Sequence, residues 1–311
     1  MIGIVVLNYR TPEKTIECVD SILKYTKKKF RIYVVDNHSE DGSLDRLKGY
    51  YINFSHICII SSNENGGYSK GNNIGIRRAV KDGAECIAVI NSDVVLLNDA
   101  IDILYDNLFS NDDIGLVGPS ISYNNNEQQF ARKKLDLRGF ISSKKPFYWI
   151  SKNHFGHNCR NIGWDKRTKL FIFSGMVSGC CFLIKSDIFK EIGFFDENIF
   201  LFHEEDIIAY KLEHINKKVG IVRDAKISHE ESSSVGKNGL AFSRYHRVIS
   251  SLYVLRVYAK LNRFKMVLPI ITALSPLFLY SIFSKPYRNI CKNLYPQIHE
   301  IIKINPHHNR I

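Results

Sequence analysis

The chain has 311 residues, of which 45% are hydrophobic and 24% are charged, and its 43 Lys and Arg exceed its 31 Asp and Glu to give a formal net charge of +12. This composition excludes a disordered or low-complexity protein, and the length suffices for one large domain or two modest ones. Most of the charge lies in residues 240–311, where eleven Lys or Arg accompany a single acid. A basic segment of this size indicates an anionic partner, either nucleic acid or a membrane surface.

Short apolar runs alternate with helical patterns along the first part of the chain. The runs predict strands at residues 2–7, 31–35, 57–61, 86–90 and 116–117. Between the first two runs, apolar residues recur at helical spacing over residues 12–24. The alternation predicts βαβ units and a mostly parallel sheet covered by helices on both faces. Because such sheets bind ligands at the carboxyl ends of their strands, the residues that follow each run are candidate site residues.

Polar residues follow three of the predicted strands. The second run ends in Asp36, and the fourth ends in Asn91-Ser92-Asp93. After the third run, residues 63–75 include glycines that permit a ligand to approach the backbone closely. Each segment taken alone also fits an ordinary turn between a strand and a helix. None is a G-x-G-x-x-G fingerprint after the first strand or a phosphate loop that ends in Gly-Lys-Ser, which disfavours a dinucleotide-binding or P-loop protein.

Three consecutive acids, Glu204, Glu205 and Asp206, stand between an aromatic cluster and an apolar helical pattern. Acids at the start of a helix are stabilised by the helix dipole and need no function. Their apolar neighbours nevertheless favour a half-buried position in a cleft. A further candidate, His229, follows the strand-like run 219–222, although a lone His is more often an ordinary core or surface residue.

Taken together, these segments resemble inverting nucleotide-sugar glycosyltransferases of family 2, of the rhamnosyltransferase-like kind found in O-antigen and capsule biosynthesis. Five motifs occur in the family's order within residues 1–235. They lie at residues 5–10, 35–43, 65–75, 91–93, and 178–179 followed by 193–196 and 204–205. The resemblance implies a GT-A fold, an α/β architecture in which helices flank a Rossmann-like, mostly parallel central sheet.

The resemblance also implies a metal site and contacts to the donor. Asp93 matches the last acid of the family's D-x-D motif, which binds a divalent cation, and His229 matches a family His that completes the metal or diphosphate site. The cation would be Mg²⁺ or Mn²⁺, would take oxygen ligands, and would neutralise charge on the departing diphosphate. The residues expected to contact the nucleotide sugar, a UDP or dTDP sugar, are Asn8, Tyr9, Asp36, Asn65, Gly67, Asn72, Asn91 and Gly179.

The general base follows from the same comparison. Glu204-Glu205 matches the family's Glu-Asp pair, whose second acid takes the proton of the acceptor hydroxyl as that hydroxyl attacks C1. Lys211 falls where the family has a basic residue six places later, and this register assigns the base to Glu205. A register shifted by one residue assigns it to Asp206 instead. We therefore expect all three acids, Glu204 to Asp206, to belong to the catalytic site.

A stretch of nineteen residues without a formal charge, 266–284, is long enough to span a bilayer. Pro269 and Pro276 interrupt it, so three alternatives remain open: an interfacial or re-entrant segment, a packed core helix, and a spanning helix. Basic residues that suit anionic lipid headgroups follow at Lys285, Arg288 and Lys292. Because no nucleic-acid-reading module appears, we expect a membrane surface as the partner and no nucleic acid.

We therefore expect a GT-A glycosyltransferase domain over residues 1–239, with nucleotide-sugar binding in 1–120 and the acceptor side in 121–239, and a helical membrane-associating tail over 240–311. The expected enzyme is a hexosyltransferase that moves one sugar to a lipid-linked saccharide at the cytoplasmic face of the cell membrane. An odd number of cysteines without C-x-x-C spacing agrees with that compartment. The alternatives are a processive polysaccharide synthase and a non-catalytic nucleotide-sugar or membrane-binding module of the same fold.

Overall fold

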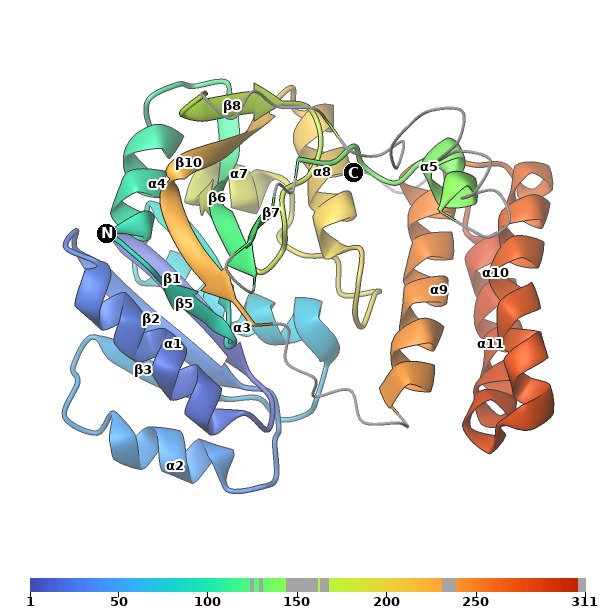
Figure 1. Cartoon of the computed structure of the whole chain (residues 1–311), viewed down its shortest axis with the longest axis horizontal. Coiled ribbons are helices and arrows are strands. Elements are labelled where there is room, and N and C mark those ends of the chain that lie inside the picture. The colour runs from blue at the N-terminus through green and yellow to red at the C-terminus, as the bar shows by residue number, and fades with distance from the viewer. Residues whose placement is uncertain (124–125, 129–130, 144–161, 163–167, 231–238, 307–311) are drawn as a thin grey trace.

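The computed structural model describes residues 1–123, 126–128, 131–143, 162, 168–230 and 239–306. A central sheet with helices on both faces carries the first part of the chain, and three long C-terminal helices stand beside it (Figure 1). Within the acceptor-side region expected over 121–239, residues 124–125, 129–130, 144–161, 163–167 and 231–238 lie outside the described residues.

Four parallel strands form the N-terminal half of the sheet: β1 (Ile2–Asn8), β2 (Phe30–Asp36), β3 (Ile57–Ser61) and β4 (Cys86–Asn91). Their order is β3-β2-β1-β4. The register pairs Asn8 with Asp36, and Leu7 with Asn91. The carboxyl ends of β2, β1 and β4 therefore lie side by side and present these polar residues at one edge of the sheet.

The second half of the sheet mixes strand directions. It consists of β9 (Cys181–Lys185), β6 (Ile114–Tyr123), β10 (Lys218–His229) and β5 (Val94–Leu96), with β7 (Asn126–Gln128) and β8 (Leu170–Phe173) paired to β6 and β10. β9 runs antiparallel to β4, whereas β10 is parallel to β6 and antiparallel to β5. The last β10 residue, His229, pairs with Val94 in β5. The α/β architecture expected from the sequence is confirmed.

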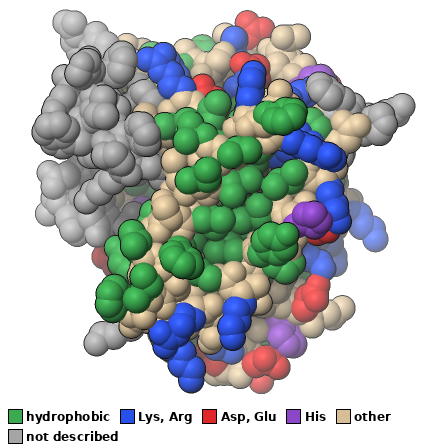
Figure 2. All heavy atoms as spheres, turned by 90° about the vertical axis from the view of Figure 1, so that its right-hand side faces the viewer, with side chains coloured by type: hydrophobic (Ala, Val, Ile, Leu, Met, Phe, Trp, Pro, Cys, Tyr) green, Lys and Arg blue, Asp and Glu red, His purple; other side chains and the backbone are tan. Residues whose placement is uncertain are grey.

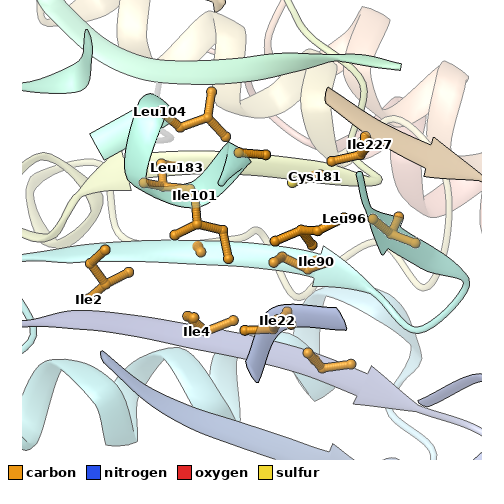
Figure 3. Packing of buried hydrophobic residues seen from close by; sticks show 14 of the residues in the cluster. Ile2, Ile4, Ile22, Ile90, Leu96, Ile101, Leu104, Cys181, Leu183 and Ile227 are labelled. Atoms are coloured by element: carbon orange, nitrogen blue, oxygen red, sulfur yellow. The ribbon is translucent and has the colours of Figure 1, made fainter. Parts of the chain in front are cut away.

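Helices cover both faces of the sheet. They are α1 (Pro12–Tyr25), α2 (Ser43–Tyr50), α3 (Gly67–Lys81), α4 (Ala100–Leu108), α7 (Ser186–Glu191) and α8 (Glu204–His214). The short helix α5 (Leu137–Ser142) lies beside the C-terminal helices instead. On one face, Ile22 of α1 and Ile101 and Leu104 of α4 pack over Ile4 and Ile90 of the strands (Figure 3). α3, α7 and α8 contribute to a second core on the other face. Because both faces are covered, the parallel strands are continuous apolar runs.

The C-terminal helices α9 (Gly239–Val257), α10 (Arg263–Phe283) and α11 (Lys285–Lys303) build a third core, which also includes Ile199 and Ile207 from the sheet-bearing part. The hydroxyls of Tyr253 and Tyr258 donate hydrogen bonds to the Asp196 carboxylate at 2.9 and 2.8 Å. The division expected between residues 239 and 240 thus separates segments that share a core, and it stays a prediction.

One face of α10 packs on its neighbours through Met266, Ala273 and Leu277, which are at most 3% exposed. Its other face is apolar and exposed, with Phe264 and Phe283 about nine-tenths accessible. Lys and Arg side chains border this apolar face (Figure 2). Within the described part of the chain, α10 is the one helix that is long and apolar enough to cross a membrane by length and composition.

Candidate active site

A buried hydrogen-bond network holds the ends of β1 and β2. The Asp36 carboxylate, 2% exposed, accepts hydrogen bonds from Asn8 Nδ2 at 2.7 Å, from the Ser39 hydroxyl at 2.6 Å and from the Ser39 amide at 3.1 Å. Asn8 Oδ1 accepts one from the Thr15 hydroxyl at 2.8 Å. Protein groups thus engage both Asp36 oxygens and fix the strand ends. The nucleotide contacts expected of Asn8 and Asp36 stay predictions.

Tyr9 follows β1 and is 41% exposed, and the Arg10 guanidinium lies over its ring at 5.2 Å. Arg10 has a φ of +58° and binds Ser39 through both its amide and its Nε. An exposed aromatic ring at this edge of the sheet offers a flat face on which a nucleobase can stack. The pattern along the chain does not predict the contact of Arg10 with Ser39, because this contact forms across the strand ends.

The glycine-rich segment is shaped by contacts with the loop before α8. Gly67 has a φ of +81°, and a Cβ atom there would lie 2.2 Å from the Phe200 carbonyl oxygen, so only glycine fits. Asn65 Oδ1 accepts a hydrogen bond from the Gly67 amide at 3.1 Å. Asn72 Nδ2 donates to the main-chain carbonyl of Tyr68 at 3.0 Å. Asn65, Gly67 and Asn72 therefore shape the segment, and their contacts with a donor stay predictions.

Tyr68 connects two of the expected site residues. Its hydroxyl lies 3.1 Å from Asn91 Oδ1 and 2.9 Å from the Gly179 carbonyl oxygen, so it can donate to either. The Gly179 amide in turn donates to Glu205 Oε1 at 3.1 Å. A continuous chain of polar contacts thus runs from the end of β4 to the acidic cluster. Tyr68 was not among the site residues expected from the sequence. Its place between the glycines of the third motif could have indicated it.

Asp93 and His229, the two expected metal ligands, lie together. His229 Nε2 is 3.2 Å from Asp93 Oδ1, and the two side chains are 19% and 14% exposed. A carboxylate oxygen and an imidazole nitrogen this close suit one divalent cation, whose remaining positions oxygen ligands from a diphosphate or water can fill. No group of three or more His, Cys, Asp or Glu that could hold a metal occurs among the residues that the structure describes.

The three acids begin α8 but differ in their surroundings. Glu204 is 5% exposed, and burial together with the neighbouring Glu205 raises its pKa to about 8. Asp206 is 2% exposed, accepts a hydrogen bond from the Leu135 amide through Oδ1, and lies 2.8 Å from His203 Nδ1 through Oδ2. Asp206 therefore has a structural environment in which both oxygens are engaged.

Glu205 lies beside an apolar pocket that Met176, Phe182 and Ile208 help to line, and burial raises its pKa. A Cβ atom on Gly179 would lie 2.5 Å from Glu205 Oε1, so a glycine at 179 is what allows the carboxylate this position. Of the three acids, Glu205 is the one that the Tyr68 and Gly179 contacts connect to the strand ends.

A model described as glycosyl transferase family 2 matches residues 2–193 of the chain. Glycosyltransferase GlyG of Streptococcus pneumoniae serotype 4 is 25% identical over 228 residues, which are 72% of this chain and 70% of that protein. The low-salt glycan biosynthesis hexosyltransferase Agl10 of Haloferax volcanii is 24% identical over 225 residues, 70% of this chain and 64% of that protein. The chain thus spans just under two thirds of Agl10.

Solved structures share the fold at low identity. GalNAc-T7 with UDP, GalNAc and Mn²⁺ has a TM-score of 0.60 at 15% identity, over 83% of this chain and 48% of that one. The mannosyltransferase PcManGT from Pyrobaculum calidifontis, in complex with GDP-Man and Mn²⁺, has a TM-score of 0.56 at 13% identity, over 96% of this chain and 85% of that one. These likenesses show that the chain has the GT-A fold.

Proposed function

Because the chain belongs to glycosyl transferase family 2, we propose that it transfers one hexosyl residue, with inversion, from a nucleoside-diphosphate sugar to a lipid-linked saccharide in surface polysaccharide biosynthesis. The observation that carries the proposal is the chain of contacts from Asn91 through Tyr68 and Gly179 to Glu205. It connects the carboxyl edge of the parallel strands, where such sheets bind ligands, to a half-buried carboxylate. The names of both curated relatives, a glycosyltransferase and a hexosyltransferase, support the same reaction class.

The donor lies across the ends of β2, β1 and β4 in this proposal. Tyr9 stacks on the base, the Asn8–Asp36 network and the Asn65–Asn72 segment form the walls, and Asn91 faces the ribose. Asp93 and His229 hold Mg²⁺ or Mn²⁺, which, when bound, neutralises charge on the leaving diphosphate. Mn²⁺ accompanies UDP in one structural neighbour and GDP-Man in the other, which supports a divalent cation and a nucleotide donor here.

Glu205 is the general base in this proposal. Its burial beside an apolar pocket raises its pKa, which makes the carboxylate a better proton acceptor near neutral pH. Glu204, with a pKa raised to about 8, holds a proton and thereby lets its neighbour stay ionised. Asp206 is the weaker candidate, because the Leu135 amide and His203 engage its two oxygens.

The membrane surface is the proposed location of the acceptor. The exposed apolar face of α10 enters the interface of the membrane, and the basic side chains around it face anionic headgroups on the cytoplasmic side. The packing of its other face on α9 and α11 favours an interfacial helix over a spanning one, since a spanning helix would leave these neighbours.

Thermal shift measurements with a panel of nucleoside-diphosphate sugars, with and without Mn²⁺, test the proposal. We expect at least one sugar nucleotide to stabilise the protein only when Mn²⁺ is present. An Asp93→Ala variant should lose this stabilisation, whereas Asp113→Ala, which alters an exposed acid at the opposite end of the sheet, should keep it. A panel in which no sugar nucleotide stabilises the folded protein contradicts the proposal.

A further inference from the structure

A groove of about 530 Å³ lies between the first turns of α9 and α11. It combines aromatic rings, amide side chains and one lysine. Its lining residues include Phe242, Tyr245 and His246 from α9, and Lys285, Asn289 and Asn293 from α11. None of the described residues that line it is acidic. Aromatic faces and amides suit a saccharide, and a lysine without a neighbouring acid suits a phosphate.

One aromatic ring separates this groove from the candidate active site. The Phe200 ring stacks on His246 with ring centroids 4.7 Å apart and meets the edge of Phe242 at 5.8 Å. The Phe200 carbonyl oxygen accepts a hydrogen bond from the Tyr68 amide at 2.8 Å. Phe200 also lies in the loop that leads into Glu204. Phe200 therefore connects the wall of the groove to the loop that precedes the acidic cluster.

The other end of the groove adjoins the apolar face of α10. Lys285 begins α11 directly after Ser284, and Ile282 and Phe283, the last residues of α10, are 54% and 90% exposed. Chain continuity thus places the lysine at the border between the groove and the apolar surface. Burial lowers the pKa of His246 to about 4, so the imidazole is neutral at neutral pH and Lys285 supplies the positive charge among the lining residues.

We propose that this groove binds the phosphate-bearing head of the lipid-linked acceptor, with the phosphate at Lys285, the first sugars between the aromatic and amide side chains, and the lipid on the exposed face of α10. The proposal rests on the function proposed above and adds where the acceptor binds. It commits to an amphiphile because a basic, polar groove adjoins an exposed apolar surface. A free phosphate would use only the first of these features.

The test uses farnesyl diphosphate as a probe with the full-length protein in EDTA, so that the metal-dependent donor site does not compete. We expect calorimetric titration to detect binding that Lys285→Ala weakens about tenfold or more, in the range expected for a lost charge-assisted contact. Lys292→Ala removes an exposed lysine of α11 that does not line the groove, and it should bind like the unaltered protein. Methyl diphosphate, which has no lipid chain, should bind more weakly than farnesyl diphosphate.

Equal binding by Lys285→Ala and the unaltered protein would overturn the proposal. Equal losses in both lysine variants would also overturn it, since they would indicate general attraction to charge. Binding of vesicles with phosphatidylglycerol should be alike in both lysine variants, and a selective loss there in Lys285→Ala would assign the lysine to bulk headgroups instead. The thermal shift panel with Mn²⁺ is a separate measurement. Failure of the farnesyl diphosphate titration overturns the acceptor groove and leaves the proposed reaction standing. Failure of the thermal shift panel contradicts the proposed reaction.

Discussion

His229 Nε2 lies 3.2 Å from Asp93 Oδ1, although the two residues come from distant parts of the chain. The antiparallel pairing of β10 with β5 creates this contact, because it places His229 opposite Val94, the residue after Asp93. A carboxylate and an imidazole that meet in this way are the two ligands that we propose for a divalent cation.

Substitution of either residue should weaken the binding of Mn²⁺ with a sugar nucleotide. For His229→Ala we expect the Mn²⁺ concentration at half-maximal thermal stabilisation to rise about tenfold, which corresponds to about 1.4 kcal/mol. Asp93→Ala, which removes the charged ligand, should have the larger effect. His56→Ala is the matched control, because it removes a His at the amino end of β3. Unchanged Mn²⁺ dependence in His229→Ala would exclude the imidazole as a ligand.

Tyr68→Phe tests the chain of contacts between Asn91 and Gly179. The ring keeps its edge contact with Phe195, at 5.7 Å between centroids, so the fold should persist with a loss of about 1 kcal/mol in the free energy of unfolding. We expect turnover to fall about tenfold in a transfer assay. Loss of the hydroxyl frees the Gly179 carbonyl, and the amide of the same residue is the group that binds Glu205. Tyr50→Phe removes a hydroxyl that binds Asp20 on the exposed side of α2 and should leave turnover unchanged. Turnover equal to that of the unaltered protein would rule out this positioning role.

The pKa of Glu204, raised from 4.5 to about 8, predicts a pH dependence of stability. Between these two values the folded protein holds a proton that the unfolded chain releases, so the free energy of unfolding should fall as the pH rises. The slope contributed by this group is at most about 1.4 kcal/mol per pH unit. Urea unfolding at pH 5, 6.5 and 8 should show a shallower decline for Glu204→Gln, which cannot ionise at this position. Parallel declines in the two proteins would contradict the assignment.

Polar substitutions on the exposed face of α10 should release the protein from membranes. The triple variant Phe264→Ser, Phe278→Ser and Phe283→Ser removes rings that are 67% to 90% exposed, so the folded state should lose little stability. We expect binding to anionic vesicles in a sedimentation assay to weaken at least about tenfold, since each buried ring contributes about 1.5–3 kcal/mol. Ile52→Ser, which alters an apolar side chain 78% exposed after α2, is the control. Vesicle binding that survives the triple substitution would assign the membrane contact to another surface.

The sequence predicts those site residues that lie directly at the carboxyl ends of the parallel strands. Continuous apolar runs mark the parallel strands, and Asp36, Asn91 and Asp93 follow them because ligand-facing polar residues come at carboxyl ends. The expected place of His229 beside the metal rested on a family resemblance. The structure shows His229 beside Asp93, and this contact results from the long-range pairing of β10 with β5, which periodicity along the chain does not predict.

Other features depend on contacts between distant segments. The choice between Glu205 and Asp206 was open in the sequence, where both acids begin one helix. Contacts with distant segments separate their surroundings, because Gly179 binds Glu205 whereas Leu135 and His203 bind Asp206. The position of α9 was likewise hidden, because a basic amphipathic pattern does not show that Tyr253 and Tyr258 bind Asp196. The sequence predicts a helical membrane-associating tail over residues 240–311, and the structure adds that these helices share a core with Ile199 and Ile207.

The most direct test of the central claim compares Glu205→Gln with Asp206→Asn in a transfer assay, with the sugar nucleotide that the thermal shift panel identifies and membranes as the source of acceptor. We expect Glu205→Gln to keep Mn²⁺-dependent donor binding and to lose about 10²- to 10⁴-fold in turnover, the usual contribution of a general base. Asp206→Asn should mainly lower stability, because its carboxylate binds Leu135 and His203. Full turnover in Glu205→Gln, or a loss confined to a folded Asp206→Asn, would contradict the account.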